Sequence, residues 1–391
     1  MHTGPAAKEG AAGPVAVQAD RGEGDTLSIL LAGLRAVNPA LVLLFAADGA
    51  ELGALHGGLR AGLPAGCVLA GCSSAGEIGP CGYATDSVVA IGFPAGHFRA
   101  RTLVLPNLSA LPVSEWMAAL RRLHLDFAAD PHCALFGLLL VDGLAGQEDA
   151  LVATIDAALP SVPTLGGSAG DGLDFDRTSL LVDGEVVSNA AVFTLVETDL
   201  AVSEVTFAHF SPTETRAVVT AAIPEKRRIL ELNAEPAAEE YARIIGIPPE
   251  RLTPTEFARH PLLLRMGRRH HVRAISALTE DGGLSLMSAI DTGTVLTLGR
   301  AEDLTEGFAE ALAALPRPPL MVLGFDCILR RLALEREGLT QTMSELFRRY
   351  RVAGFNTYGE QHSGMHVNQT FVGLAFMAQA GAGGTGRTDA A

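Results

Sequence analysis

The sequence predicts an α/β protein of repeated strand–helix–strand units, with a mainly parallel sheet in its N-terminal half and a mixed sheet in its C-terminal half. Three observations predict this class. A short polar turn occurs three times, each copy follows a short apolar segment, and about 30 residues before each copy another apolar run ends in an aspartate. Each unit therefore reads as strand, aspartate, helix, strand and polar turn, the alternation that builds parallel strand pairs.

The three turns share a pattern of a small hydroxyl residue, any residue, a glycine and an acid. Residues Ala70–Glu77 align without gaps on Ala353–Glu360, and Ser168–Asp171 keeps the core of the pattern. The apolar runs that end in aspartate extend from Ala40 to Asp48, from Leu135 to Asp142 and from Leu320 to Asp326.

The elements of the N-terminal half follow from hydrophobic periodicity. Helical spacing of apolar residues marks the helices, and continuous apolar runs, typical of strands buried on both faces, mark the strands. The predicted helices are Leu27–Val37, Gly53–Leu63, Trp116–Asp126 and Gln147–Leu159. The predicted strands are Leu41–Ala47, Cys67–Ala70, Ser87–Phe93, Leu135–Val141, Ser179–Val182 and Val186–Val196, the last two joined as a hairpin at Asp183-Gly184.

The pattern changes from about Phe207, where antiparallel strands and helices alternate irregularly. The predicted strands here are Val218–Ala222, Arg268–Ala277, Ser285–Ala289 and Val367–Met377, and the helices are Pro236–Ile245, Asp303–Ala314, Ile328–Gly338 and Thr342–Tyr350. Because both chain ends are rich in glycine and alanine, we expect a disordered segment at 1–24 and a disordered tail at 379–391. The change of pattern places two domains between them, at 25–225 and 226–378.

Composition excludes several classes of partner. The chain has 391 residues and a formal charge of −15, which argues against nucleic acid or an anionic membrane as main partner. The basic cluster Lys226–Arg228 reads as solvated surface. No apolar run reaches the ~18 residues of a membrane helix, and no signal peptide is evident. Five cysteines without a C-x-x-C motif predict a reducing cytoplasm, with neither a disulfide framework nor a zinc site.

The three turns predict a shared ligand pocket, because ligands of α/β sheets bind where strand carboxyl ends meet and small residues leave backbone N–H groups free. The alternative is a duplicated structural turn without a ligand. We also expect the turn acids to pair with Arg273 or Arg330, since a buried unpaired carboxylate is costly. The predicted pocket residues are Ser73, Ser74, Glu77, Ser168, Asp171, Arg273, Asp326, Asn356, Thr357, Tyr358, Glu360, His366 and Asn368.

An enzymatic alternative rests on possible nucleophiles. Residues Gly166–Gly170 match the G-x-S-x-G elbow with Ser168 as nucleophile, but the elbow must lead into a helix, and the residues after Gly170 lack helical apolar spacing. Cys72 and Cys327 are the other candidates, although their apolar neighbours favour buried inert thiols. We therefore expect no catalytic residue.

Taken together, these segments resemble the FIST sensory domain, with its N-terminal and C-terminal parts in order from about Asn38 to Met377. The resemblance is carried by Gly71–Glu77, Gly166–Asp171, Phe325–Cys327 with Arg330, Gly354–Glu360, Met365–Thr370, Pro236-Ala237, Glu240-Tyr241, His260-Pro261 and Val272-Arg273. The chain departs from the family pattern at Asn233, where glycine is usual, and at His270-His271, where tyrosine-like residues are usual.

The resemblance implies a bacterial signal-input protein that binds a small ligand between its two halves. FIST domains are often fused to output domains, for which this chain has no room. A stand-alone FIST protein resembles the nitric-oxide-sensing haemoproteins called NosP, which act on a partner histidine kinase in trans. This implies haem b as cofactor, NO as signal and a histidine kinase or other signalling protein as partner, with homodimerisation left open.

Two ligand classes remain open at this stage. Haem needs one neutral imidazole on its iron, and the candidate ligands are His271, His260 and His366. The first two lie beside basic residues that can meet propionates, whereas the third belongs to the general FIST motif. The alternative ligand is a colourless metabolite such as an amino acid.

Overall fold

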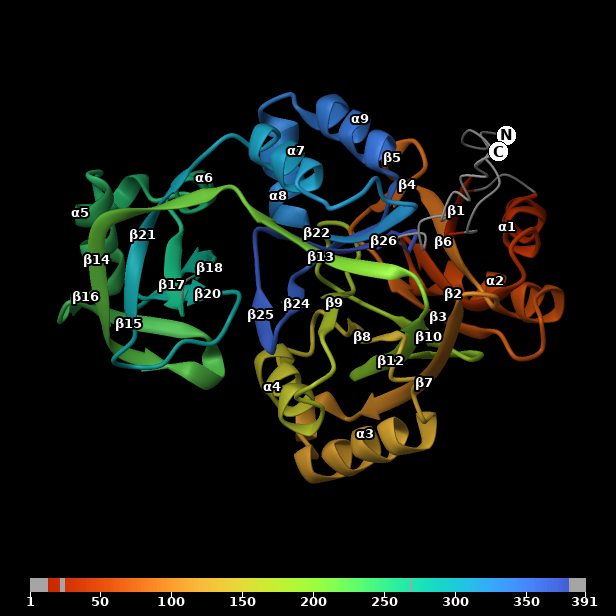
Figure 1. Ribbon diagram of the computed structural model, residues 1–391. Helices are drawn as coiled ribbons and strands as arrows, with labels where there is room; N and C mark the ends of the chain where they lie inside the picture. Colours follow the sequence, from red (N-terminus) through yellow and green to blue (C-terminus); the bar gives the residue numbers. More distant parts are fainter. Residues whose placement is uncertain (1–12, 22–24, 268, 380–391) are drawn as a thin grey trace, which may run out of the picture.

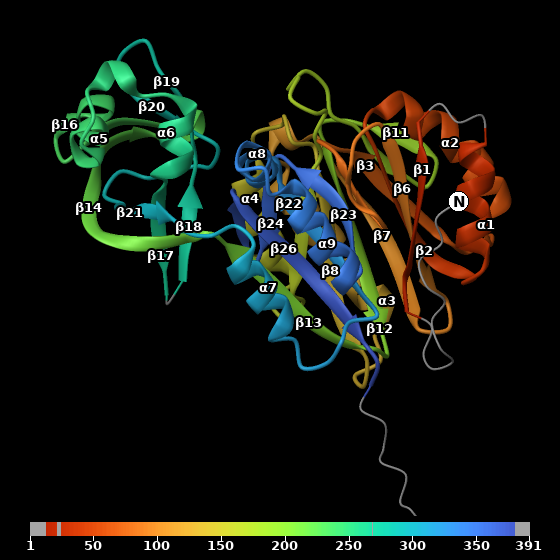
Figure 2. The same ribbon diagram turned by 90° about the horizontal axis from the view of Figure 1, so that it is seen from above.

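The protein folds into two lobes of unequal size, as the computed structural model in Figure 1 shows for residues 13–21, 25–267 and 269–379. Among the described residues, the larger core lobe contains those of 13–208 and 302–379, whereas the outer lobe contains those of the intervening segment 209–301. Figure 2 shows the outer lobe standing beside the core lobe, joined to it at β14 and β21. The third repeat thus belongs to the core lobe with the first two.

Three six-stranded sheets of identical plan make up the core lobe. In spatial order, the first consists of β1 (Val15–Asp20), β6 (Ser87–Pro94), β2 (Pro39–Ala46), β3 (Val68–Ser73), β10 (Leu180–Val182) and β11 (Glu185–Val187). The second consists of β7 (Phe98–Pro106), β12 (Ala190–Thr198), β8 (Ala134–Val141), β9 (Thr164–Ser168), β24 (Glu360–His362) and β25 (Met365–Val367). The third consists of β13 (Ala201–Ala208), β26 (Thr370–Met377), β22 (Met321–Cys327), β23 (Val352–Thr357), β4 (Glu77–Gly79) and β5 (Gly82–Ala84).

Each sheet ends in a hairpin contributed by another repeat. The hairpin β4–β5 follows β3 of the first repeat but joins the third sheet beside β23. The hairpin β10–β11 follows the second repeat and joins the first sheet beside β3, and β24–β25 follows the third repeat and joins the second sheet beside β9. This cyclic exchange gives the core lobe a pseudo-threefold arrangement.

The inner faces of all three sheets share one apolar core. Phe93 from β6 and Phe136 from β8 both contact Phe376 from β26, with ring centroids 5.8 and 6.0 Å apart. Because one aromatic ring comes from each sheet, this contact closes the centre of the lobe.

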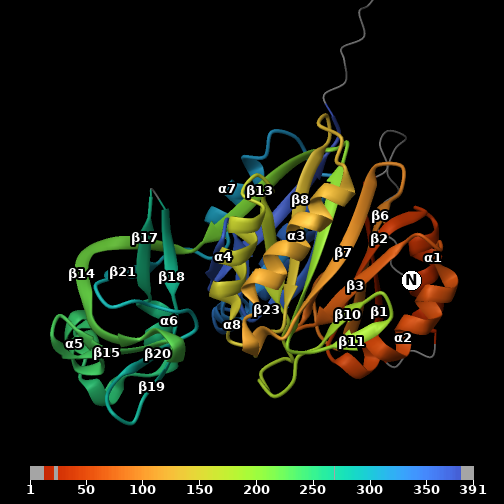
Figure 3. The same ribbon diagram turned by 90° about the horizontal axis from the view of Figure 1, so that it is seen from below.

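Helices cover the outer face of each sheet. The first sheet is covered by α1 and α2, the second by α3 and α4, which Figure 3 shows in front of it, and the third by α7, α8 and α9. Their bounds are α1 (Thr26–Arg35), α2 (Gly49–Gly62), α3 (Val113–Phe127), α4 (Glu148–Ala158), α7 (Glu306–Ala313), α8 (Ile328–Arg336) and α9 (Thr340–Tyr350), with a short 3-10 turn at Leu108–Ala110.

The outer lobe is an eight-stranded antiparallel structure with its own core, around Tyr241 and Phe257. Its strands are β14 (Phe210–Ile223), β15 (Arg228–Leu232), β16 (Glu235–Pro236), β17 (Leu262–Met266), β18 (Arg269–Arg273), β19 (Ile275–Leu278), β20 (Leu284–Leu286) and β21 (Val295–Ala301). Its helices are α5 (Ala237–Ile245) and α6 (Pro254–Arg259), with 3-10 turns at Pro224–Lys226 and Pro249–Arg251.

The structure has the predicted α/β class and the three strand–helix–strand repeats. The sheets of its first half, however, are not mainly parallel as expected. Each core sheet contains one parallel pair, β2–β3, β8–β9 or β22–β23, and the remaining pairs are antiparallel. The reason is that the chain passes from each turn through a hairpin in another sheet and then returns as an antiparallel strand beside the first one, without a second helical crossover.

The expected disorder of the N-terminal segment needs correction. Val15–Asp20 is a strand paired with β6, not part of a disordered segment, because its alternating apolar residues pack on the first sheet. Residues 1–12, 22–24 and 380–391 of the expected disordered ends lie outside the described residues. The predicted domain boundary at 225 falls within the outer lobe, and the range 226–378 divides between the two lobes.

Candidate functional site

The three polar turns meet at the pseudo-threefold centre and bind one another through their backbones. Ala75 N–H donates to the Asn356 carbonyl (3.0 Å), Tyr358 N–H to the Ser168 carbonyl (3.1 Å) and Gly170 N–H to the Ser73 carbonyl (3.1 Å). Every turn therefore donates to one neighbour and accepts from the other.

The structure shifts the alignment of the turn Ser168–Asp171 on the other two turns by one residue. In each parallel pair a glycine faces the first strand so closely that a Cβ would lie within about 2 Å of a carbonyl oxygen, namely Gly71, Gly166 and Gly354. Counting from these glycines, the equivalent residues are Ser73, Ser168 and Asn356, followed by Ser74, Ala169 and Thr357. The expected equivalence of Ser168 with Ser74 is wrong. The shared pattern of hydroxyl residue, glycine and acid aligned the two turns one residue away from their structural match, in which Ser168 corresponds to Ser73.

Further backbone bonds use the N–H groups expected to be free for a ligand. Asn356 N–H donates to the Gly76 carbonyl (2.7 Å), Ser168 N–H to the Gly359 carbonyl (2.8 Å) and Ser73 N–H to the Ser179 carbonyl (2.8 Å). The side chains of Ser73, Ser168 and Asn356 are fully buried. The turns thus lock the three repeats together instead of presenting an open anion cradle.

Two turn acids are partnered by hydroxyl groups rather than by arginine. Glu77 accepts from Ser74 Oγ (2.5 Å) and Ser87 Oγ (2.9 Å). Glu360, its equivalent, accepts from Thr357 Oγ1 (2.5 Å) and from Thr370 Oγ1. Burial raises the pKa of Glu77 to about 7 and that of Glu360 to about 8, because hydroxyl bonds offset only part of the desolvation of a charged carboxylate. The second repeat carries Gly172 at this position and lacks the pair.

Asp171 has a different role from the two glutamates. It accepts backbone N–H bonds from Phe175 (3.0 Å), Asp176 (2.8 Å) and Arg177 (2.7 Å), and the Tyr358 hydroxyl donates to it. These bonds hold its pKa below the usual range even though burial opposes them. Asp171 therefore shapes the loop after the second turn.

The aspartates that follow the first strands are not equivalent either. Asp48 caps α2 by accepting from Glu51 N–H (2.8 Å), and Asp142 accepts from the backbone of Leu144 and from Thr178. Asp326 forms a fully buried ion pair with Arg330 (2.7 Å). The expected pairing of a turn acid with Arg330 is therefore wrong, because Arg330 pairs with Asp326.

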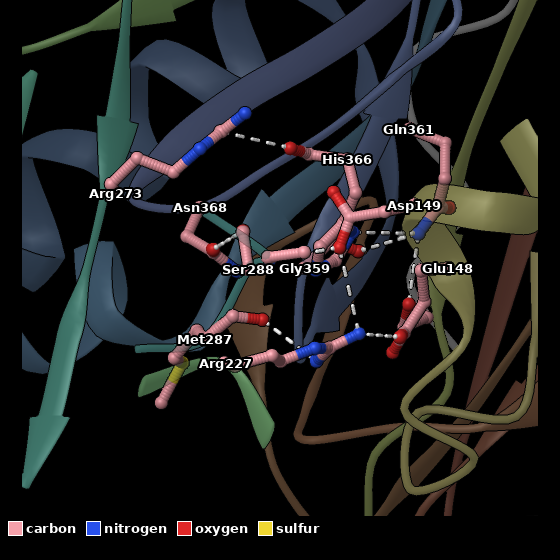
Figure 4. Close-up of polar contacts among 12 residues, drawn as sticks. Glu148, Asp149, Arg227, Arg273, Met287, Ser288, Gly359, Gln361, His366 and Asn368 are labelled. Atoms are coloured by element: carbon pink, nitrogen blue, oxygen red, sulfur yellow. Dashed lines mark hydrogen bonds and ion pairs between the residues drawn. The ribbon is translucent and has the colours of Figure 1, made fainter. Parts of the chain in front are cut away.

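Three of the predicted pocket residues, Arg273, His366 and Asn368, do come together, at the contact between the lobes (Figure 4). Arg273 at the end of β18 donates from Nη1 to the His366 carbonyl (3.4 Å), and Ser288 Oγ donates to Asn368 Oδ1 (2.7 Å). Gln361 connects this region to the turns, because its Nε2 donates to Ser168 Oγ (2.8 Å) and lies 3.4 Å from His366 Nδ1. We call this region the interlobe seam, made of Glu148, Asp149, Arg227, Arg273, Met287, Ser288, Gln361, His366 and Asn368.

The sequence did not reveal the other half of the seam. Arg227 was expected at the solvated surface, but it donates to Glu148 Oε2 (2.5 Å) and to the Met287 carbonyl (2.8 Å) and lies 3.7 Å from Asp149. The Glu148 side chain is only 3% exposed. The one available signal was the pair of acids at the start of α4, where a helix N-terminus favours negative charge.

Arg273 is unusual in its electrostatic setting. It is 6% exposed, and its Nε has no hydrogen-bond partner among the described residues. Within the described part of the chain, Nη1 donates only to the carbonyls of His366 (3.4 Å) and Val272 (3.5 Å). Burial lowers its pKa, which nearby Asp149 partly opposes. A buried guanidinium with unused donors is costly, and a carboxylate would satisfy its planar fork.

The three candidate haem ligands lie in different surroundings. His366 is 2% exposed, and burial lowers its pKa, so its ring is neutral as an iron ligand must be. It is packed tightly, since a Cβ on Gly359 would lie 2.2 Å from His366 Cε1. His260 lies at the end of α6, 3.7 Å from Glu256, and His271 lies within β18. The described residues contain no group of three or more metal-binding side chains placed to hold one ion.

The candidate nucleophiles are buried. Ser168 is fully buried and its Oγ accepts from Gln361, an amide that cannot act as a base. Burial raises the thiol pKa of Cys72 and of Cys327 well above the ordinary value, which keeps both thiols protonated and weakly nucleophilic.

Comparison with known proteins identifies the family. The model of the FIST N domain matches residues 40–235, and the model of the FIST C domain matches residues 237–363. No curated protein matches the chain. Among the described residues, no helix is both long and apolar enough to cross a membrane. FIST domains are signal-sensing domains, so a sensory role follows from the match. The two matched regions cover most of the sequence, and the chain therefore belongs to the FIST family.

Proposed function

We propose that this protein is a cytoplasmic signal-input protein that binds a small carboxylate-bearing metabolite, such as an amino acid, at the interlobe seam. The observation that carries the proposal is Arg273, a buried guanidinium whose Nε has no partner among the described residues. A ligand carboxylate would form the paired N–H···O bonds that an arginine fork favours.

The rest of the seam supplies complementary groups. Glu148 and Asp149 offer carboxylates for a ligand ammonium group, and Asn368 and Gln361 offer amides for polar contacts. Arg227 currently neutralises the two acids and would exchange partners when an ammonium group enters. An amino acid carries both charges and so matches both ends of the seam.

Such a ligand would act on the contacts that join the lobes. Arg227, Arg273 and Ser288 belong to the outer lobe, and their partners Glu148, His366 and Asn368 belong to the core lobe. A ligand that binds one lobe arrangement better than another shifts the population toward it. We propose that this shift is the signal read by a histidine kinase or another signalling protein in trans, with homodimerisation of the sensor left open.

The test is calorimetric titration of the protein with a panel of amino acids and simple carboxylates. Arg273→Lys keeps the positive charge but loses the fork, and we expect at least a tenfold loss of affinity. Arg216→Lys, at an exposed position on β14, is the matched control and should bind as the parent does. A panel without any binding carboxylate, or equal binding by Arg273→Lys, contradicts the proposal.

Haem with NO as the signal is the second candidate, and the neutral, buried ring of His366 is the observation that favours it. Of the three predicted ligands, only His366 lies in the seam, where Arg273 would meet a propionate. A bound haem b would supply the iron that takes NO. The two acids Glu148 and Asp149 and the tight packing at Gly359 suit a small polar ligand better than they suit haem.

Absorption spectroscopy separates the two candidates. Protein produced with haem available should show a Soret band under the haem hypothesis, and His366→Ala should abolish it while His260→Ala and His271→Ala retain it. A colourless protein that binds a carboxylate supports the first candidate. The enzymatic alternative through Ser168, Cys72 or Cys327 would instead require an activity that serine or cysteine reagents block.

A further inference from the structure

A cavity of about 300 Å³ opens on the core lobe, on the far side of Gln361 from the turns. It lies between α4 with its following loop, strand β13 and the tip of the β24–β25 hairpin. Figure 1 shows the end of β25 beside α4. Its lining is Val152, Asp156, Pro160, Ser161, Val162, Pro163, Thr164, Glu204, Gln361, His362, Ser363 and Gly364. We call it the hairpin cavity. Its size suits a small ligand.

The charged side chains that line the hairpin cavity are acids. Asp156 and Glu204 supply two carboxylates, and no lysine or arginine is among the described residues that line it. His362, 5% exposed, lies with Nε2 2.8 Å from Glu204 Oε2 and 3.3 Å from Ser363 Oγ. Asp156 reaches the hairpin tip, where a Cβ on Gly364 would lie 3.0 Å from its Cγ. The lining therefore favours a cation.

Gln361 provides an independent sign of a missing partner. Its side chain is 1% exposed and it lines the cavity, while its Nε2 is engaged by Ser168 and Gly359. Its Oε1 accepts no hydrogen bond from any described residue. A buried acceptor without a donor is costly, and a ligand N–H would satisfy it.

The spacing of these groups distinguishes between kinds of cation. Asp156, Glu204 and His362 line one cavity, yet they do not converge on a point where one metal ion could bind all three. A metal ion needs its ligands within about 2–2.6 Å. An extended molecule can meet the separated acceptors one after another.

We propose that the hairpin cavity binds a small organic cation with two protonated amino groups, of the diamine or polyamine class. One ammonium group pairs with Glu204 and the other with Asp156, and an N–H donates to Gln361 Oε1. The methylene chain between them lies against Val152, Val162 and the prolines of the α4–β9 loop. This site shares Gln361 with the interlobe seam, but Asp156 and Glu204 lie outside the seam, and the proposal does not depend on the function proposed for the seam.

The experiment is calorimetric titration of the full chain with putrescine, spermidine and the uncharged analogue 1,4-butanediol, at low salt. We expect binding of at least one amine and none of the diol, and at least a tenfold loss of affinity in Asp156→Asn and in Glu204→Gln. Glu337→Gln, an exposed acid at the end of α8, is the matched control and should retain binding.

Every other outcome overturns the proposal. Equal binding of the diol would show that charge is irrelevant, and unchanged affinity in both acid variants would place the amine elsewhere. Binding of Mg²⁺, Ca²⁺ or Zn²⁺ but not of an amine would make this a metal site. The two acid variants lie on different elements, so misfolding of one, checked by circular dichroism, leaves the other to decide the matter.

Discussion

At the scale of single residues, Glu77 and Glu360 show how burial without a cationic partner changes a carboxylate. Each accepts two hydroxyl hydrogen bonds, and neither has an arginine or lysine at ion-pair distance among the described residues. Hydroxyls can donate to a carboxylate and can also accept from a carboxylic acid, so both protonation states are satisfied. The desolvation of the charge then decides, and it favours the protonated acid.

This arrangement predicts that stability falls as pH rises. The pKa of Glu360 is about 8 in the folded protein against 4.5 as its ordinary value, so the folded state holds a proton that the unfolded state releases. Between pH 4.5 and 8 the free energy of unfolding should lose about 1.4 kcal/mol per pH unit from this group. Glu360→Gln mimics the protonated acid, so it should match the parent near pH 5 and exceed its stability at pH 8. Urea unfolding at a series of pH values measures the difference.

The effect of Glu360 on stability can be separated from that of Glu77, because Glu77 changes the free energy of unfolding over a narrower pH range. Its folded pKa is about 7, so its own contribution is complete by neutral pH. Parallel pH profiles for the parent and Glu360→Gln between pH 7 and 8 would mean that Glu360 ionises normally. Glu337→Gln serves as the exposed control and should leave the profile unchanged.

At the scale of elements, each parallel strand pair depends on a glycine at its closest approach. A Cβ on Gly166 would lie 1.8 Å from the Leu139 carbonyl oxygen, and one on Gly354 would lie 1.8 Å from the Gly324 carbonyl oxygen. The obstacle is backbone in both cases, so no side-chain rotation relieves it. The same feature occurs at Gly71, which shows that close packing is part of the repeated unit.

Gly166→Ala should therefore destabilise the protein by at least about 3 kcal/mol. Gly57→Ala is the matched comparison, because Gly57 lies inside α2 and no described atom comes within 4 Å of the added Cβ. That variant should gain about 0.5–1 kcal/mol from the higher helix propensity of alanine. Chemical denaturation of both variants gives the values, and a Gly166→Ala protein as stable as the parent would refute the close-packing explanation.

The sequence predicted those helices and strands that have a clear local pattern of apolar residues. Continuous apolar runs predicted β2, β8 and β22 correctly, and helical spacing found α3, α4 and α5. Strand β7 was missed because two arginines, Arg99 and Arg101, stand in its first half. The predicted strand Val186–Val196 proved to be two, β11 and β12, because Asn189 adopts a positive φ between them.

The candidate site was predictable only in part, for the same reason. His366, Asn368 and Arg273 were marked by motif, but Arg227 and Glu148 belong to segments 79 residues apart that meet only through the docking of the two lobes. The exchange of hairpins among repeats escaped prediction as well, since no local signal states which sheet a hairpin joins.

At the scale of the whole molecule, the two lobes differ in how they are held. The core lobe is closed by cyclic exchange, so no repeat can leave without breaking strand pairs with both of the other repeats. The outer lobe is attached by two chain crossings, at His209 and after Ala301, and by the contacts of the seam. The core should therefore unfold as one unit, whereas the outer lobe is free to change its position more easily.

The contact between Arg227 and Glu148 gives the sharpest test of this difference. Arg227→Met leaves the buried Glu148 without its partner, which is costly, and the protein can relieve that cost by separating the lobes at the seam so that water reaches the carboxylate. We expect faster hydrogen exchange at the start of α4 and at residues 287–289, with unchanged exchange in β2, β8 and β22. Adding Glu148→Gln to this variant should restore slow exchange at the seam, because no buried charge then remains. If exchange rises equally throughout the core lobe, or if the double variant exchanges as fast as Arg227→Met alone, then the seam is not an independent contact and the lobes move as one body.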